Sequence, residues 1–133
     1  MATARFWREN ASMYNLIASR CTACGALQFP PRTFCPVCHR RSLGKMERFK
    51  LKGEGEIYSF SIVHEATADL EMQKPYVLAM MRMDEGVMLT AQVVDCKLED
   101  AKIGLRVRAV LRLLSEEGPD GVIHYGYKFV PLA

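Results

Sequence analysis

Alternating hydrophobic and polar positions dominate the C-terminal part of the chain, and a period of two is typical of strands with one buried face. The stretches that we interpret as strands are residues 56–63, 76–83, 87–94, 107–114 and 122–130. Asp84-Glu85-Gly86 joins the second and third of them as a tight hairpin. Gly86 supplies the left-handed conformation that such a turn needs. The pattern therefore predicts an all-β domain.

The last stretch alternates most clearly. One face carries Ile123, Tyr125, Tyr127 and Phe129, and the other carries His124, Gly126 and Lys128. The aromatic face could equally be core or a surface for stacking bases. Gly53-Glu54-Gly55 marks a bend or bulge where the first strand begins. Five strands, with the only candidate helix of the domain at residues 95–102, indicate a small Greek-key barrel of the OB type.

An amphipathic helix is predicted near the N-terminus, over residues 4–14. Phe6 and Trp7 recur two turns later as Met13 and Tyr14, whereas charged residues fall on the other side. One short helix cannot bury these aromatic side chains within itself, so it must pack on the rest of the chain or on a partner. We favour a partner, docked through Phe6, Trp7 and Tyr14.

Four of the five cysteines form two Cys-x-x-Cys pairs, Cys21/Cys24 and Cys35/Cys38. Each pair places two thiolates at the tip of a tight turn, and two such turns together offer a tetrahedral site with Zn–S distances of about 2.3 Å. Gly25 fits the first turn because glycine tolerates a positive φ. We therefore predict one structural Zn²⁺ bound by all four cysteines.

Two disulfides or four unrelated thiols are the alternatives to zinc. His39 or His64 could in principle replace a sulfur ligand, but four cysteines already complete a closed site. Cys96 is expected to be a buried core residue. Short strands at residues 16–20 and 27–29 flank the first pair, and residues 40–52 are interpreted as a basic connector.

Composition and charge narrow the class of protein. Half of the 133 residues are hydrophobic and a quarter are charged, as in soluble globular proteins. The longest apolar run, Tyr76 to Met81, is far too short to cross a bilayer. No targeting segment is visible, and reduced cysteines fit a reducing compartment, so we expect a cytoplasmic protein.

The net charge of +3 is distributed unevenly. Residues 1–53 carry ten Lys/Arg and two Glu, a balance of +8, whereas residues 54–133 carry a balance of −5. A basic half suits an anionic partner such as nucleic acid, a phosphorylated cofactor or an acidic protein face. A solvated basic surface explains the same charges.

The combined order of motifs resembles the DUF35 family. The matching pieces are Phe6-Trp7, the two cysteine pairs with Phe29-Pro30-Pro31-Arg32 between them, Gly53-x-Gly55, Tyr58-Ser59, Val63-His64, Pro75-Tyr76, Asp84-Glu85-Gly86-Val87 and Ile103-Gly104. Met46 departs from the pattern, because such proteins often carry an aromatic residue there. The resemblance implies a mainly β protein with a short N-terminal helix (1–15), a rubredoxin-like zinc ribbon and connector (16–52) and a five-stranded OB-fold barrel (53–133).

The resemblance also implies a function. Proteins of this family accompany thiolase-like enzymes, and archaeal members bridge acetoacetyl-CoA thiolase and HMG-CoA synthase at the entry to the mevalonate pathway. Acyl-CoA binding has also been suggested for the family. We therefore expect a non-catalytic accessory subunit of a thiolase-type complex. The candidate contacts to CoA phosphates are Arg32, Arg40, Arg41 and Lys74.

Two other functions compete with the accessory role. Zinc ribbons and OB-folds also bind nucleic acid, and the basic first half is compatible with that, although the barrel half is acidic. An enzyme would need acid–base groups, and the barrel offers only His64 and His124, neither with a recognisable nucleophile or carboxylate in sequence. We interpret both histidines as ordinary strand residues.

Overall fold

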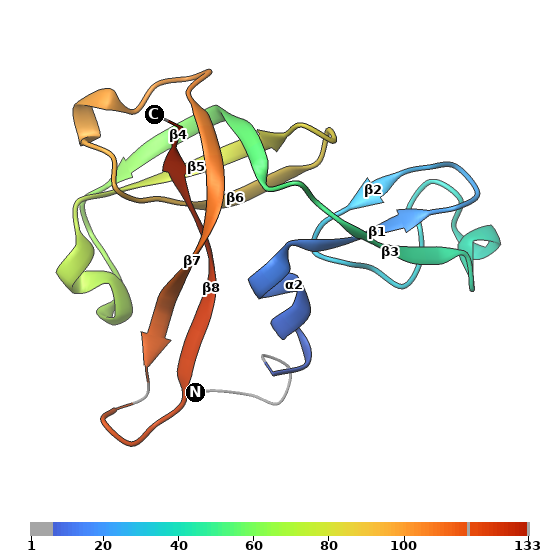
Figure 1. Ribbon diagram of the computed structural model, residues 1–133, viewed down its shortest axis with the longest axis horizontal. Coiled ribbons are helices and arrows are strands. Elements are labelled where there is room, and N and C mark those ends of the chain that lie inside the picture. The colour runs from blue at the N-terminus through green and yellow to red at the C-terminus, as the bar shows by residue number, and fades with distance from the viewer. Residues whose placement is uncertain (1–6, 117, 133) are drawn as a thin grey trace.

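The C-terminal strands close into a barrel in the computed structural model, which describes residues 7–116 and 118–132, the side chain of Asp69 excepted (Figure 1). The barrel strands are β4 (Glu54–Val63), β5 (Tyr76–Met83), β6 (Met88–Val93), β7 (Arg106–Glu116) and β8 (Ile123–Pro131). Their order around the barrel is β4-β5-β6-β8-β7, and β7 pairs with β4 to close it. Only β6 and β8 run parallel, paired at Val93 and Phe129. The predicted five-stranded OB-type barrel is confirmed.

Two short 3₁₀ helices lie in the barrel connections, η2 (Ala68–Gln73) and η3 (Leu98–Asp100). The candidate helix at residues 95–102 is therefore a single turn. The segment before β5 contains η2. Such short turns bury few side chains, and so they leave little hydrophobic periodicity in a sequence.

The ribbon is a three-stranded sheet in the order β2-β1-β3, formed by β1 (Ile17–Cys21), β2 (Leu27–Gln28) and β3 (Met46–Lys50). A short 3₁₀ helix, η1 (Arg40–Ser42), follows the second cysteine pair. Our interpretation of residues 40–52 as a mere connector was wrong, because β3 lies within it and pairs with all of β1. The charged residues of β3 conceal its alternation, and its partner strand stabilises it.

The N-terminal helix α2 spans Asn10–Asn15, and Trp7 and Arg8 are also helical. Phe6 lies outside the described residues. The helix ends at Leu16, which adopts a left-handed φ of 52° and donates its N–H to the Ser12 carbonyl at 3.0 Å. Within the described part of the chain, no helix is long and apolar enough to span a membrane.

One hydrophobic core joins the two sheets. Phe129, Ile57 and Met81 fill the barrel with exposures of at most 1%. Leu16 and Leu51, at the neck of the ribbon, belong to the same cluster, and the Leu51 N–H donates to the Leu16 carbonyl at 3.0 Å. The ribbon is therefore packed onto the barrel as well as tethered to it (Figure 1).

The last strand alternates as expected, but over residues 123–128 the polar face is the more buried one. His124 and Lys128 are 8% and 5% exposed, whereas Tyr125 is 38% exposed. A period of two defines the two faces of a strand, but it does not show which face is covered by another element. Here α2 contacts β8, and its Met13 approaches Gly126 on the polar face.

Gly55 is required where β4 crosses β5. A Cβ at this position would lie 2.5 Å from the Arg82 carbonyl oxygen and 3.0 Å from the Met83 Cα, and neither backbone atom can yield easily. Gly55→Ala is therefore expected to lower the free energy of unfolding by about 1–3 kcal/mol, as overpacking does. Urea denaturation of the zinc-loaded protein measures this loss.

Gly126→Ala is the matched control for Gly55. A Cβ at Gly126 would also meet an atom at 2.5 Å, but that atom is the Cδ1 of Leu114, at the end of a flexible side chain. The loss at Gly126 should therefore be clearly smaller. Equal losses at the two positions would contradict the backbone explanation for Gly55.

Candidate metal centre and exposed surfaces

Two tight turns present the cysteine pairs of the ribbon. In the first, Gly25 has a φ of 77° and its N–H donates to the Cys21 carbonyl at 2.7 Å. In the second, His39 has a φ of 52° and its N–H donates to the Cys35 carbonyl at 2.8 Å. The turn predicted from Gly25 is present, whereas the second turn uses a non-glycine residue in the left-handed region.

The four sulfur atoms converge. The Sγ atoms of Cys21, Cys24, Cys35 and Cys38 all lie within 4.8 Å of one another. The Cys24–Cys35 pair is separated by 3.5 Å and the Cys21–Cys38 pair by 3.9 Å. A tetrahedral zinc with bonds of about 2.3 Å requires sulfur separations of about 3.8 Å, whereas a disulfide requires about 2.05 Å. The spacing fits metal binding, and all four thiols are free of disulfides.

The electrostatics of the cluster also favour a cation. The backbone N–H of Cys38 and then that of Val37 donate toward Cys35 and help to lower the pKa of its thiol to about 7. The pKa of the Cys38 thiol rises to about 12, first through its contact with Cys24 and then through burial. The cluster alone therefore resists further deprotonation. A Zn²⁺ ion supplies the positive charge that four thiolates need.

Ser42 supports the second turn, and sequence reasoning missed it. Its side chain is fully buried, its hydroxyl accepts the Cys35 N–H at 2.7 Å, and it donates to the His39 carbonyl at 2.6 Å. A serine beside two arginines carries no distinguishing signal in sequence. Its role becomes visible only when the turn is closed.

The remaining thiol and the histidines lie outside the cluster. The group of potential ligands among the described residues consists of the four cysteines and includes neither His39 nor His64. Cys96 is half-buried and packs against the core, so the prediction of a buried residue holds in part. Burial, followed by the charge of Asp100, raises the pKa of the Cys96 thiol.

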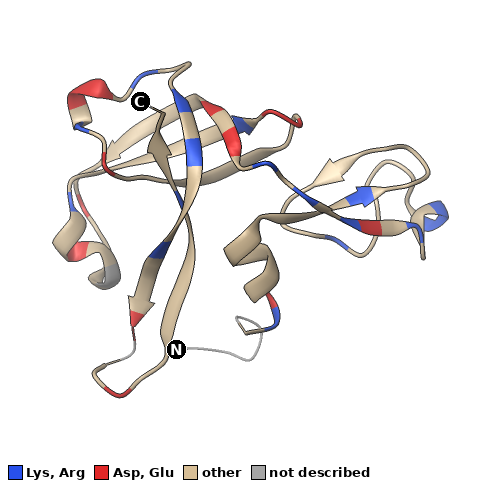
Figure 2. Cartoon of the chain, viewed as in Figure 1, with Lys and Arg blue, Asp and Glu red and all other residues tan. Residues whose placement is uncertain are grey.

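The four basic residues proposed for CoA do not form one site. Arg40 and Arg41 lie in η1 at the far end of the ribbon, whereas Lys74 follows η2 on the barrel and pairs with Glu71 at 2.5 Å (Figures 1 and 2). Arg32 precedes all three in sequence and follows β2. Its N–H donates to the Ser19 hydroxyl at 2.9 Å, and its side chain is exposed.

Arg32 lines a groove of about 540 Å³ between α2, the ribbon and β8. Arg8 and Arg48 line the same groove, and Phe29 and Met13 contribute apolar wall. Sequence reasoning did not single out Arg8 or Arg48, because the helix and β3 bring them near Arg32 only in the folded chain. Glu9 and Glu47 also line the groove, which therefore combines a small excess of positive charge with apolar surface.

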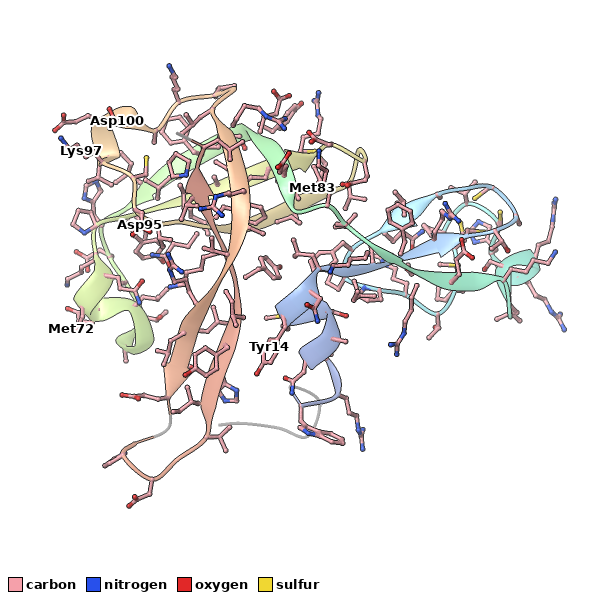
Figure 3. All side chains as sticks on the ribbon, in the orientation of Figure 1. Tyr14, Met72, Met83, Asp95, Lys97 and Asp100 are labelled. Atoms are coloured by element: carbon pink, nitrogen blue, oxygen red, sulfur yellow. The ribbon has the colours of Figure 1, made fainter. Side chains whose placement is uncertain are left out.

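Two of the three predicted docking residues, Trp7 and Tyr14, lie in the described part of the chain and are exposed. Trp7 is 74% exposed and Tyr14 is 41% exposed. Tyr14 projects from α2 toward the β7–β8 hairpin (Figure 3), and it lines a shallow hollow together with Leu111. The outer part of this hairpin adds further exposed apolar side chains: Leu111, Leu113, Val122, Ile123 and Tyr125. Ile123 and Tyr125 belong to the face of the last strand that the sequence left open between core and surface, and in the fold both are exposed.

Comparisons with known families match both units. A model described as the rubredoxin-like zinc ribbon domain of ChsH2 matches residues 11–44. A second model, described as the C-terminal OB-fold domain of ChsH2, matches residues 50–112. The two matches follow the order of ribbon and barrel seen in the fold.

Curated relatives and a solved structure extend the match to nearly the whole chain. The chain is 48% identical to a DUF35 domain-containing scaffold protein of Methanocaldococcus jannaschii, over 96% of this chain and 89% of the relative. It is 43% identical to the scaffold protein of the same name from Methanothermobacter thermautotrophicus, over 97% and 96%. The solved Ltp2-ChsH2(DUF35) aldolase contains a similar chain, with a TM-score of 0.74, 27% identity, and coverage of 98% and 95%.

Proposed function

The chain belongs to the DUF35 family, and on that premise we propose that it is a non-catalytic scaffold subunit of a thiolase-type acyl-CoA enzyme complex. The observation that carries the proposal is the combination of relatives named scaffold proteins with an exposed apolar surface on α2 and the β7–β8 hairpin. The aldolase that contains ChsH2 supports an enzyme as the partner.

A structural metal centre fits this role better than a catalytic one. We propose that Cys21, Cys24, Cys35 and Cys38 bind one Zn²⁺. Four thiolates occupy every position of a tetrahedral ion, so no position stays open for water or substrate. The zinc then stabilises the ribbon, and chemistry belongs to the partner enzyme.

A scaffold that bridges two enzymes needs two separate surfaces. The chain offers one on α2 and the β7–β8 hairpin, and another at the basic end of the ribbon around Arg40 and Arg41 (Figure 2). We propose acetoacetyl-CoA thiolase and HMG-CoA synthase as the enzymes, on the family resemblance. Charged residues around an apolar contact steer association and fix orientation.

If acyl-CoA contacts this chain, the groove at Arg32 is the best-supported place. CoA carries three phosphates, which arginine binds through paired N–H donors. Arg32, Arg8 and Arg48 line one groove, whereas Lys74 is already paired with Glu71 elsewhere. We therefore propose that Arg32, and not Lys74, contacts the phosphates.

The experiment that tests the scaffold role is capture of the partner from native extract of the source organism with the tagged, zinc-loaded chain. Recovery of a thiolase-type enzyme, identified by mass spectrometry, supports the proposal. Recovery of nucleic-acid factors without such an enzyme would contradict the scaffold role and favour nucleic-acid binding. The purified chain alone should show no turnover with acetyl-CoA or acetoacetyl-CoA.

Trp7→Ala is expected to weaken binding of the captured enzyme by about 2 kcal/mol or more, because exposed tryptophans are frequent anchors of interfaces. The stability of the isolated chain should change little, since the side chain is 74% exposed. Calorimetric titration with the partner measures the first quantity and thermal unfolding the second.

Met72→Ala is the matched control for Trp7. Met72 is 96% exposed and projects from η2, away from α2 in the view of Figure 3. Its loss should change neither quantity. A Trp7→Ala protein that melts at a lower temperature but binds the partner with unchanged affinity would rule out docking through this helix.

A further inference from the structure

A second hollow, of about 360 Å³, lies on the barrel side of the molecule and adjoins the Arg32 groove at Met13 and Tyr127. Its wall is formed by η2, β6, the outer β7–β8 hairpin and Met13 of α2. Among the described residues that line it, Lys128 is the one charged side chain. The family resemblance and the scaffold role leave this lysine without a function.

Lys128 is buried with little compensation for its charge. It is 5% exposed, and its Nζ donates to the Gln73 Oε1 at 3.2 Å. The same oxygen also accepts from the Gln92 Nε2 at 2.9 Å, so this neutral acceptor is shared. An ammonium has three N–H donors, and a buried charge is costly unless it is paired. Burial, followed by the charge of Arg112, lowers the pKa of Lys128.

No carboxylate is within ion-pair distance of Lys128 in the described part of the chain. The ion pairs found on the barrel are formed by other cations, and the nearby Arg112 is paired with Asp95 at 3.1 Å. Among the described side chains this ammonium has no counter-charge, and it faces a hollow. A ligand with a single negative charge would complement it there. A phosphate dianion would need a second cation there.

The rest of the wall indicates the shape of that ligand. Thr90 and Ser115 offer hydroxyl donors, whereas Leu70, Leu114 and Met13 offer apolar surface. The volume is within the range of small-molecule sites. We propose that this pocket binds a short-chain carboxylate, with its carboxylate group on the Lys128 ammonium and its alkyl chain against the leucines and Met13.

Titration of the full-length, zinc-loaded protein with hexanoate, followed by amide NMR, tests the assignment. Hexanoate should give saturable shifts at residues of the pocket, and hexan-1-ol at the same concentration should bind roughly tenfold or more weakly, because a hydrogen bond to a charged group contributes about 1.5–3 kcal/mol. Equal binding of the alcohol and the acid would overturn the proposal.

Substitutions of Lys128 distinguish the effect of its charge on hexanoate binding from the effect of its shape. Lys128→Met should weaken hexanoate binding roughly tenfold or more, and Lys128→Arg should retain most of it because the charge remains. Lys97→Met, at an exposed position on the barrel, should leave binding unchanged. Unchanged binding in a folded Lys128→Met protein contradicts the proposal. If that variant fails to fold, binding by Lys128→Arg and the comparison of acid with alcohol on the unaltered protein decide the question.

Discussion

Cys24→Ser is expected to release the zinc and to unfold the ribbon, residues 17–50. The ribbon sheet has only three short strands, and few of its residues are buried away from the neck. Metal binding to structural zinc sites of this kind contributes about 10–16 kcal/mol at neutral pH, which is comparable with the whole stability of a domain. The free energy lost with one ligand is therefore expected to exceed what the ribbon sheet can supply.

Metal analysis and hydrogen exchange measure the two effects of Cys24→Ser. About one zinc per chain is expected in the unaltered protein and little in the variant, with exchange accelerated across the ribbon and slow in the barrel strands. Cys96→Ser is the control, because this thiol lies outside the cluster and donates to the Lys97 carbonyl at 3.3 Å. A full complement of zinc in Cys24→Ser would refute the ligand assignment.

Phe129→Ala is expected to lower the free energy of unfolding of the barrel by about 3–5 kcal/mol. The ring is fully buried, and the residue sits where β6 meets β8 to complete the barrel. It also makes an edge contact with Tyr127 at a centroid distance of 6.1 Å. Such a loss is a large share of the stability of a domain of this size, which is about 5–15 kcal/mol.

Guanidinium denaturation monitored by far-UV dichroism measures this change. Phe34→Ala is the matched control, because Phe34 is 50% exposed on the ribbon and its removal leaves no cavity in the barrel. Its effect should stay within about 0.5 kcal/mol, as for other surface changes. A comparable loss in both variants would contradict the role of Phe129 in filling the barrel core.

The sequence was sufficient to predict the elements that follow strong local rules. The five barrel strands, the Gly86 turn and the cysteine cluster were all predictable, because hydrophobic period, turn chemistry and ligand spacing depend on neighbours in the chain. Strand β3 was missed, because its charges hide the alternation and only the pairing with β1 stabilises it.

Burial of the last strand and the charge of the groove depend on tertiary packing. Lys128 looks like an ordinary outward residue in sequence, yet the packing of α2 and η2 near β8 removes it from solvent. Arg8, Arg32 and Arg48 come from three separate segments and line one groove only after folding. Neither the burial of Lys128 nor the arginine groove leaves a local signal in the sequence. The residues proposed for CoA from sequence alone therefore lie far apart in the fold.

At the neck of the ribbon, the entering and leaving strands lie side by side, which allows the ribbon to be replaced as a unit. Ile17 faces Lys50 as neighbours on adjacent strands, and Leu16 is bonded to Leu51, so the chain leaves the ribbon beside the point where it entered. The metal-bound unit is therefore inserted like a module between the helix and the barrel. It can be lengthened, exchanged or removed at the paired residues Ile17 and Lys50, without changing the path of any other part of the backbone.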